Sequence, residues 1–156
     1  MAKLIQIKEQ PDDSDRQAIL DQLDIYNESM GAVYDPKAFA VLIKDPGSGQ
    51  TTGGLWARGY YDWVYIELIF VPKELRGRKI GARLVRSAER WALRSGCVGV
   101  WLDTFEFQAP AFYQSLGYET FGHLSNYPRG SRRYFLRKEF PESECRGRSI
   151  VPTDVV

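Results

Sequence analysis

The amino-acid sequence predicts a mixed α/β fold in which a long helix joins two buried strands. Residues 66–71 form an apolar run, rich in β-branched and aromatic side chains, that is almost unbroken and typical of a buried strand. Residues 80–92 repeat their apolar side chains at helical spacing. A second strand-like apolar run follows at residues 97–104. A helix between two such runs is the pattern of a parallel crossover.

The size and composition of the chain favour one ordinary globular domain. Its 156 residues allow a sizeable core, and 44% hydrophobic and 26% charged residues argue against disordered and fibrous classes. We expect a single domain over residues 1–140, followed by a loosely ordered tail over residues 141–156 without periodicity.

Several features of the sequence bear on localisation and on membrane and metal binding. No apolar run approaches the roughly 20 residues of a membrane helix, and the first residues lack the apolar region of a signal peptide. Cys97 and Cys145 form neither a CxxC pair nor a metal-ligand spacing, and His123 is the single histidine. We therefore expect a cytoplasmic protein that needs no metal and does not contact a membrane.

The N-terminal part predicts a strand, a helix and a hairpin. Residues 3–8 alternate weakly as a strand does, and Ser14 with Gln17 makes a capping-box pattern at a helix start. Gly31 is placed to end that helix. Its expected buried stripe consists of Ile19, Leu23, Tyr26 and Met30. Residues 39–44 and 51–60 flank a glycine-rich loop and predict a hairpin.

The C-terminal part predicts a short helix and two further strands. The helix covers residues 108–116, with Pro110 in its first turn and Gly117 as its end. Strands are expected at residues 118–125 and 133–140. Together with the earlier elements, these make a mixed sheet of about six to seven strands.

The segment between the central strand and the long helix is suited to phosphate. Glycines in residues 76–81 lead into a helix N-terminus, where free backbone N–H groups and the positive end of the helix dipole favour anions. Residues 73–94 carry 8 basic and 2 acidic side chains, which fits an anionic ligand as well as a solvated helix face. The glycine-rich string at residues 47–54 lacks the Lys-Ser/Thr of a P-loop and joins strands, so a P-loop is disfavoured.

Three segments in a fixed order resemble a known family. They are Leu68-Ile-Phe-Val-Pro-Lys-Glu-Leu-Arg-Gly-Arg-Lys-Ile-Gly81, Val98-Gly-Val-Trp-Leu-Asp103 and Ala109-Pro-Ala-Phe-Tyr-Gln-Ser-Leu-Gly-Tyr118. In this order the chain resembles the GNAT superfamily of acetyl-CoA-dependent N-acetyltransferases from about residue 39 to 140. The resemblance implies a GNAT-like central mixed sheet with helices on both faces. It also implies transfer of an acetyl group from acetyl-CoA to a primary amine of a small molecule or peptide.

The resemblance further implies which residues hold acetyl-CoA, mainly through backbone N–H groups. The strand end would bind the thioester and pantetheine arm through Ile69, Phe70 and Val71. The loop and helix start would bind the pyrophosphate through Arg76, Gly77, Arg78, Lys79, Ile80, Gly81 and Ala82. Two positions depart from the family pattern, since Glu74 replaces a glutamine or arginine and Lys79 replaces a small residue.

Glu67 and Tyr113 are the predicted catalytic residues. Acetyl transfer requires that an ammonium with a pKa of about 10.4 lose a proton, and a departing thiolate with a pKa near 8.5 benefits from a proton donor. Glu67 is the polar residue of an apolar strand and resembles the family's base, acting through water; Tyr113 resembles the family's acid. Alternation places Glu67 with Ile69 and Val71 unless a bulge intervenes. The structural alternatives are a carboxylate paired with an arginine or tyrosine, and a core aromatic.

The acceptor amine is less clearly predicted. Aromatic side chains of the hairpin and carboxylates of the first helix are suited to a cationic amine, although hairpin aromatics also pack across strands. We name Tyr26, Trp56 and Tyr61 as substrate residues. Loop residues Tyr127 and Arg129 are placed to cover the acceptor cleft.

Two alternatives to an amine acetyltransferase remain at this point. One is a catalytically silent acyl-CoA-binding or sensing module. The other, nucleic-acid binding through residues 73–94, is disfavoured because no stacking aromatics interleave with the charges. Cys97 begins a buried strand and is expected to pack, not to act as a nucleophile. The oligomeric state, including a homodimer, and the identity of the acceptor are left open.

Overall fold

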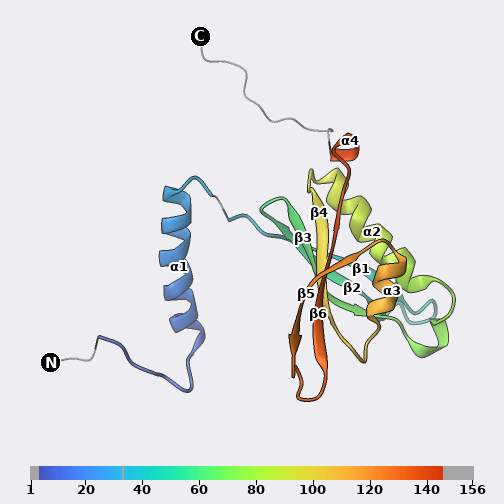
Figure 1. Ribbon diagram of the computed structural model, residues 1–156, viewed down its shortest axis with the longest axis horizontal. Helices are drawn as coiled ribbons and strands as arrows, with labels where there is room; N and C mark the ends of the chain where they lie inside the picture. Colours follow the sequence, from blue (N-terminus) through green and yellow to red (C-terminus); the bar gives the residue numbers. More distant parts are fainter. Residues whose placement is uncertain (1–3, 33, 146–156) are drawn as a thin grey trace, which may run out of the picture. The chain divides into compact units, whose positions relative to one another are not determined.

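The computed structural model describes residues 4–32 and 34–145 and divides the chain into two compact units (Figure 1). The first unit, residues 1–35, contains helix α1 (Asp13–Ser29). The second unit, residues 36–156, contains the sheet and the remaining helices. The single domain expected over residues 1–140 stays a prediction.

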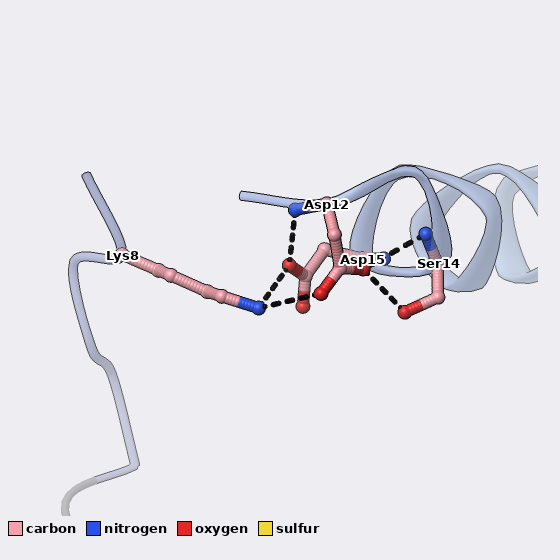
Figure 2. Close-up of polar contacts among 4 residues, drawn as sticks. All are labelled: Lys8, Asp12, Ser14 and Asp15. Carbon is pink, nitrogen blue, oxygen red and sulfur yellow. Dashed lines mark hydrogen bonds and ion pairs between the residues drawn. The ribbon is translucent and has the colours of Figure 1, made fainter. Parts of the chain in front are cut away.

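Helix α1 begins at an aspartate and not at the expected serine. The Asp12 carboxylate accepts hydrogen bonds from the N–H groups of Ser14 and Asp15, at 2.9 and 3.2 Å, and the Asp15 carboxylate accepts the N–H of Asp12 at 3.0 Å. The Lys8 ammonium binds both carboxylates, as Figure 2 shows. The predicted box of Ser14 and Gln17 is therefore wrong by two residues, because Asp12 is an equally good cap and lies first in the chain.

The end of α1 was predicted correctly, and its surroundings were not. Gly31 follows the helix with φ +82° and donates its N–H to the Glu28 carbonyl, as a C′ glycine does. Residues 4–8 form no strand, and the described part of this unit offers no second strand for pairing. No residue of α1 is buried, and within residues 4–32 and 34–35 no other helix or strand covers its apolar stripe.

The described residues of the second unit form a six-stranded mixed sheet. The strands are β1 (Lys37–Lys44), β2 (Thr51–Tyr60), β3 (Trp63–Phe70), β4 (Gly99–Phe105), β5 (Glu119–Ser125) and β6 (Arg132–Glu139), in the spatial order β1-β2-β3-β4-β6-β5. All neighbours are antiparallel except β3 and β4. Both the predicted hairpin and the predicted parallel crossover are confirmed.

Helices α2 (Ile80–Arg94) and α3 (Pro110–Ser115) pack on the same face of this sheet (Figure 1). Helix α2 buries Leu84, Val85, Ala88 and Ala92. Facing these are the fully buried side chains of the inner strands, among them Val64, Val100, Leu102 and Leu136. Along most of β3 and β4, buried residues alternate with residues that are partly or fully exposed on β3 and partly exposed on β4, as expected for strands with one face under a helix.

The connecting segments complete the unit. A 3₁₀ turn (Lys73–Leu75) follows β3, and a short helix α4 (Glu142–Cys145) follows β6. Most of the expected loosely ordered tail, residues 146–156, lies outside the described residues. Within residues 4–32 and 34–145, no helix combines the length and the apolar character that crossing a membrane requires.

An irregularity at the end of β3 opens the sheet. Trp56 of β2 pairs with Leu68, and the next residue, Ala57, pairs with Ile66, so Glu67 is an extra residue on β3. Such a bulge bends its strand and increases the local twist. On the other side of β3, the parallel pairing with β4 ends at Ile66 and Leu102. The two central strands therefore part immediately before Glu67 and Asp103.

Candidate active site

A cleft of about 780 Å³ lies where β3 and β4 part. Its walls are the end of β3, the loop before α2, the first turn of α2, residues 102–104 of β4 and the segment around α3. This volume is in the range of small-molecule and cofactor sites. Nine of the ten residues expected to hold acetyl-CoA line the cleft, and Arg78 does not.

The N-terminus of α2 opens into this cleft without a side-chain cap. Lys79 is the N-cap residue, with φ +58° and no hydrogen bond from its side chain to the helix. The first N–H groups of a helix have no intrahelical acceptor, and they carry the positive end of the dipole. In α1 the corresponding groups are bound by the Asp12 carboxylate. The start of α2 can therefore receive an anionic group from a ligand.

Two contacts shape the loop before α2. The Arg76 side chain donates from Nε to the Val71 carbonyl at 3.0 Å, and its guanidinium lies 6.0 Å from the centre of the Phe70 ring. Arg76 thus fastens the loop to the end of β3.

A Cβ atom on Gly81 would lie 3.1 Å from Phe112 Cζ, so the glycine permits close packing of α2 on α3.

Glu67 lines the cleft from the bulge of β3 and forms an ion pair with Arg58. Its side chain is 24% exposed and that of Arg58 is 43% exposed. Arg58 follows Ala57, which is fully buried under α2, so the pair lies toward the opposite face of the sheet. Ile69 and Val71 pack on the core, so the bulge separates them from Glu67. Glu67 therefore has both a structural partner and access to the cleft.

Tyr113 reaches the cleft from α3 and is 6% exposed. Its ring meets the rings of Phe112 and Tyr118 edge to face. Burial raises the pKa of Tyr113 to about 12, and the negative charge of Asp103 adds to this effect. The hydroxyl therefore keeps its proton at neutral pH and is available as a donor to a group in the cleft.

Comparison with known proteins identifies the family of this chain. The sequence matches the Acetyltransferase (GNAT) family over residues 4–118. A blasticidin-S acetyltransferase from Streptomyces morookaense is 37% identical over 92 residues, covering 58% of this chain and 68% of that protein. An acetyltransferase from Agrobacterium fabrum is 32% identical over 123 residues, covering 79% of this chain and 89% of that protein. This chain belongs to the GNAT acetyltransferase family.

Solved GNAT structures share the arrangement of the sheet and helices. A crystal structure of a protein assigned as an acetyltransferase from Agrobacterium tumefaciens matches with a TM-score of 0.82 and 29% identity, over 88% of this chain and 100% of that one. An acetyltransferase from Bacillus cereus matches with a TM-score of 0.76 and 25% identity, over 86% and 98%. The predicted family, the mixed α/β fold and the acyltransferase activity are confirmed.

In this GNAT acetyltransferase, a second carboxylate at the cleft was missed by the sequence analysis. Asp103 lines the cleft from β4. Its Oδ2 accepts the Tyr65 hydroxyl at 2.7 Å, and its Oδ1 accepts Nε and Nη2 of Arg133 at 2.6 and 2.5 Å. Burial and this hydrogen bond raise the pKa of Tyr65 to about 12. The signal that could have found Asp103 is the one used for Glu67, an acidic residue within an apolar strand.

The three predicted substrate residues lie in different places of the GNAT structure. Trp56 lies opposite Leu68, beside the Glu67 bulge, and is 46% exposed. Tyr61 lies in the β2–β3 turn, at the other end of β3, and lines a separate aromatic cavity of about 570 Å³. Tyr26 belongs to α1 in the first unit. Of the two that belong to the second unit, Trp56 lies beside the Glu67 bulge and Tyr61 does not.

Cys97 has the surroundings of a packing residue. It is 6% exposed and belongs to the hydrophobic core. Burial raises the pKa of its thiol, with a smaller contribution from Asp62, so the reactive thiolate is disfavoured. Among the residues that the structure describes, no three or more His, Cys, Asp or Glu side chains gather in a way that could hold a metal ion.

Proposed function

We propose that this enzyme binds acetyl-CoA in the cleft at the β3–β4 opening and transfers the acetyl group directly to a primary amine. Enzymes of this family use acetyl-CoA. The observation that carries the proposal is the uncapped N-terminus of α2, which faces the cleft. The same cleft is lined by residues at the point where β3 and β4 part. The pyrophosphate is held by main-chain N–H groups from Gly77 to Ala82, with Lys79 adding a positive charge.

The acetyl group is placed at the strand opening. There the N–H groups of residues 69–71, at the end of β3, are directed to the pantetheine arm and thioester carbonyl. A hydrogen bond to the carbonyl oxygen stabilises the negative charge that develops on it during attack. The end of the β3–β4 pairing at Ile66 and Leu102 supports this assignment, because beyond it the backbone groups of residues 69–71 that face β4 have no partner on that strand.

Glu67 acts as the base. The acceptor reaches the site as an ammonium, and Glu67 takes up its proton through a water molecule. The nitrogen lone pair then attacks the carbonyl carbon to form a tetrahedral intermediate. Arg58 holds the carboxylate in place during this step.

Tyr113 acts as the acid. As the intermediate collapses, the C–S bond breaks, the Tyr113 hydroxyl gives its proton to the departing sulfur, and the cationic nitrogen loses its second proton to solvent. The pKa of about 12 means that the resulting phenolate regains a proton readily from water at neutral pH. The products are an amide and free CoA, and one proton is released from the original ammonium. No covalent bond to the protein forms.

The acceptor is a primary amine of a small molecule or peptide, and blasticidin S is the first compound to test. The relative that is 37% identical over 92 residues is named for acetylation of that compound. The part-exposed Trp56 beside Glu67 offers an aromatic face to a cationic acceptor.

A thiol-release assay tests the proposed function. Acetyl-CoA is mixed with enzyme and with blasticidin S, polyamines, aminoglycosides, amino acids or peptides in separate reactions. We expect acceptor-dependent release of CoA with at least one class, and thermal stabilisation of the protein by CoA alone. Absence of stabilisation at millimolar CoA would refute binding in this cleft. Stabilisation without turnover of any amine would instead favour the sensing module.

A further inference from the structure

We propose that Arg133 is a positioning residue for the acceptor amine, acting through Asp103 and Tyr127. The inference rests on the proposed function, because it concerns the substrate that meets acetyl-CoA at the strand opening. It assigns this role to a group of side chains on β4, on β6 and in the loop at residues 126–131.

Asp103 marks the β4 side of the opening. It follows Leu102, the last residue of β4 that pairs with β3, and it lines the same cleft as Glu67. Each carboxylate has its own arginine, since Glu67 pairs with Arg58 and Asp103 pairs with Arg133. The opening is therefore bounded by two ion pairs, one on each of the parting strands.

The Asp103–Arg133 pair is the more firmly held of the two. The Asp103 side chain is 11% exposed and that of Arg133 is 24% exposed, and both carboxylate oxygens already accept hydrogen bonds. The Arg133 guanidinium also lies 5.2 Å from the centre of the Phe105 ring and 5.0 Å from that of Tyr127. A planar guanidinium held by a carboxylate and by two aromatic rings has little freedom to move.

Arg133 also holds the loop at residues 126–131 in place. Its Nη1 donates to the Tyr127 hydroxyl at 2.9 Å, and the Tyr127 ring meets Phe105 edge to face. The loop itself is closed by hydrogen bonds from the Tyr127 N–H to the Ser131 carbonyl and from the Ser131 N–H to the Pro128 carbonyl. Arg133 thus fixes a compact loop against β4, two residues beyond Asp103.

Loss of the Arg133 contacts is expected to affect the placement of the acceptor amine and not the binding of acetyl-CoA. Arg133 binds Asp103 and the Tyr127 hydroxyl, whereas the part of the cleft assigned to the pyrophosphate is lined by the loop before α2 and the first turn of α2. The amine must lie between Glu67 and the thioester carbon for attack, and misplacement by about 1 Å can cost ~10²-fold in rate. Asp103 is the member of this group that lines the cleft, so Arg133 acts on the acceptor by holding that carboxylate on the β4 side of the opening.

Arg133→Met and Arg133→Lys test the inference, with Arg137→Met and Arg137→Lys as matched controls. Arg137 lies on the same strand, pairs with Glu119 at 2.9 Å, and lies 5.7 Å from the centre of the Phe121 ring. It also pairs with Glu139 on β6, and none of these partners lines the cleft. The probe acceptor is the panel compound with the highest kcat/KM in the wild-type enzyme, with blasticidin S tried first.

For Arg133→Met we expect kcat/KM for the acceptor to fall ~10- to 100-fold, while the KM for acetyl-CoA and the stabilisation by CoA stay within about 2-fold of wild type. Arg133→Lys restores part of the loss, because lysine keeps the charge but not the bidentate, stacked geometry. Tyr127→Phe removes one hydrogen bond and gives a smaller loss in the same parameter. The Arg137 variants are expected to behave as wild type.

Three results would overturn the inference. One is an Arg133→Met enzyme whose acceptor kinetics match those of Arg137→Met. Another is an equal loss for acetyl-CoA and acceptor, which would indicate a general structural role. If Arg133→Met does not fold, wild-type kinetics in both Arg133→Lys and Tyr127→Phe would decide against it. A wild-type enzyme that acetylates no amine refutes the proposed function itself, whereas an active wild type with unaffected variants refutes only the role of Arg133.

Discussion

Replacing Glu67 by glutamine separates its role as a base from its role in the sheet. Glutamine has nearly the same shape and keeps an oxygen that can accept a hydrogen bond from Arg58. It cannot take up the ammonium proton at neutral pH. The substitution therefore removes the proposed chemistry and leaves the packing of the bulge almost unchanged.

The two roles of Glu67 predict effects of different size on rate and on stability. The Arg58 and Glu67 side chains are 43% and 24% exposed, and an ion pair with this much solvent contact contributes at most about 1 kcal/mol to folding. A general base contributes ~10²- to 10⁴-fold to rate, which is about 2.7 kcal/mol or more in activation free energy. We therefore expect Glu67→Gln to lower kcat at least ~100-fold, with a change in unfolding free energy of less than about 1 kcal/mol.

The assay is CoA release measured from pH 7 to pH 10, with thermal unfolding of the same samples. Without a base, only acceptor that is already neutral in solution can react, and a free amine has a pKa of about 10.4. The deficit of Glu67→Gln should therefore shrink as the pH rises. Glu119→Gln is the control, since Glu119 also pairs with an arginine, Arg137, but lies away from the cleft.

Two outcomes would refute this reasoning. One is a Glu67→Gln enzyme with kcat within about 3-fold of Glu119→Gln at neutral pH, which would leave Glu67 with a structural role alone. The other is a deficit that does not change with pH, because a lost base must be compensated when the amine deprotonates by itself.

Two further predictions concern the cleft, and a third concerns the packing of β3 on β4. Lys79→Gly keeps the left-handed backbone (φ +58°) and removes the charge. Titration with CoA should therefore show a lower affinity than wild type at low salt and a smaller difference at high salt, with little change in thermal stability. An unaltered affinity at low salt would show that Lys79 plays no part in binding. Tyr113→Phe should lower kcat ~10-fold or more at an unchanged KM for acetyl-CoA. Because the Tyr113 pKa is about 12, ionisation of Tyr113 should not lower the wild-type rate below roughly pH 11. A decline in the wild-type rate near pH 9 that is absent in Tyr113→Phe would contradict this. Gly99→Ala would bring a Cβ to 2.6 Å from the Trp63 ring and 2.7 Å from the Lys138 carbonyl, so it should cost about 1–3 kcal/mol of stability in a denaturant titration, and a neutral result would disprove the tight packing of β3 on β4 at this position.

The sequence was most informative where one local pattern determines an element. The apolar run at residues 66–71 and the helical spacing after Ile80 predicted β3, α2 and the parallel crossover between them. Gly31, Gly96 and Gly117 follow their helices with positive φ, where glycine has no steric cost. These features depend on residues close together in the chain.

The parts that were missed depend on partners distant in the sequence. The role of Asp103 becomes visible only when Tyr65, 38 positions away, and Arg133, 30 positions away, are brought to it. The facing of Glu67 depends on its bulge, which is a property of the β2–β3 register. The start of α1 was misplaced because several adjacent residues, Asp12 and Ser14 among them, can cap a helix, and local preference does not choose between them.

Transfer of an isotopically labelled acetyl group is the most direct test of the central claim. Enzyme, labelled acetyl-CoA and the acceptor panel are incubated together, and both the acceptor and the intact protein are analysed by mass spectrometry. Direct transfer in the cleft predicts label on an amine nitrogen of the acceptor, no label on the protein, and loss of the labelled product in Glu67→Gln. Label retained on the protein, on Cys97 for example, or release of CoA with labelled acetate and no acetylated amine, would contradict it.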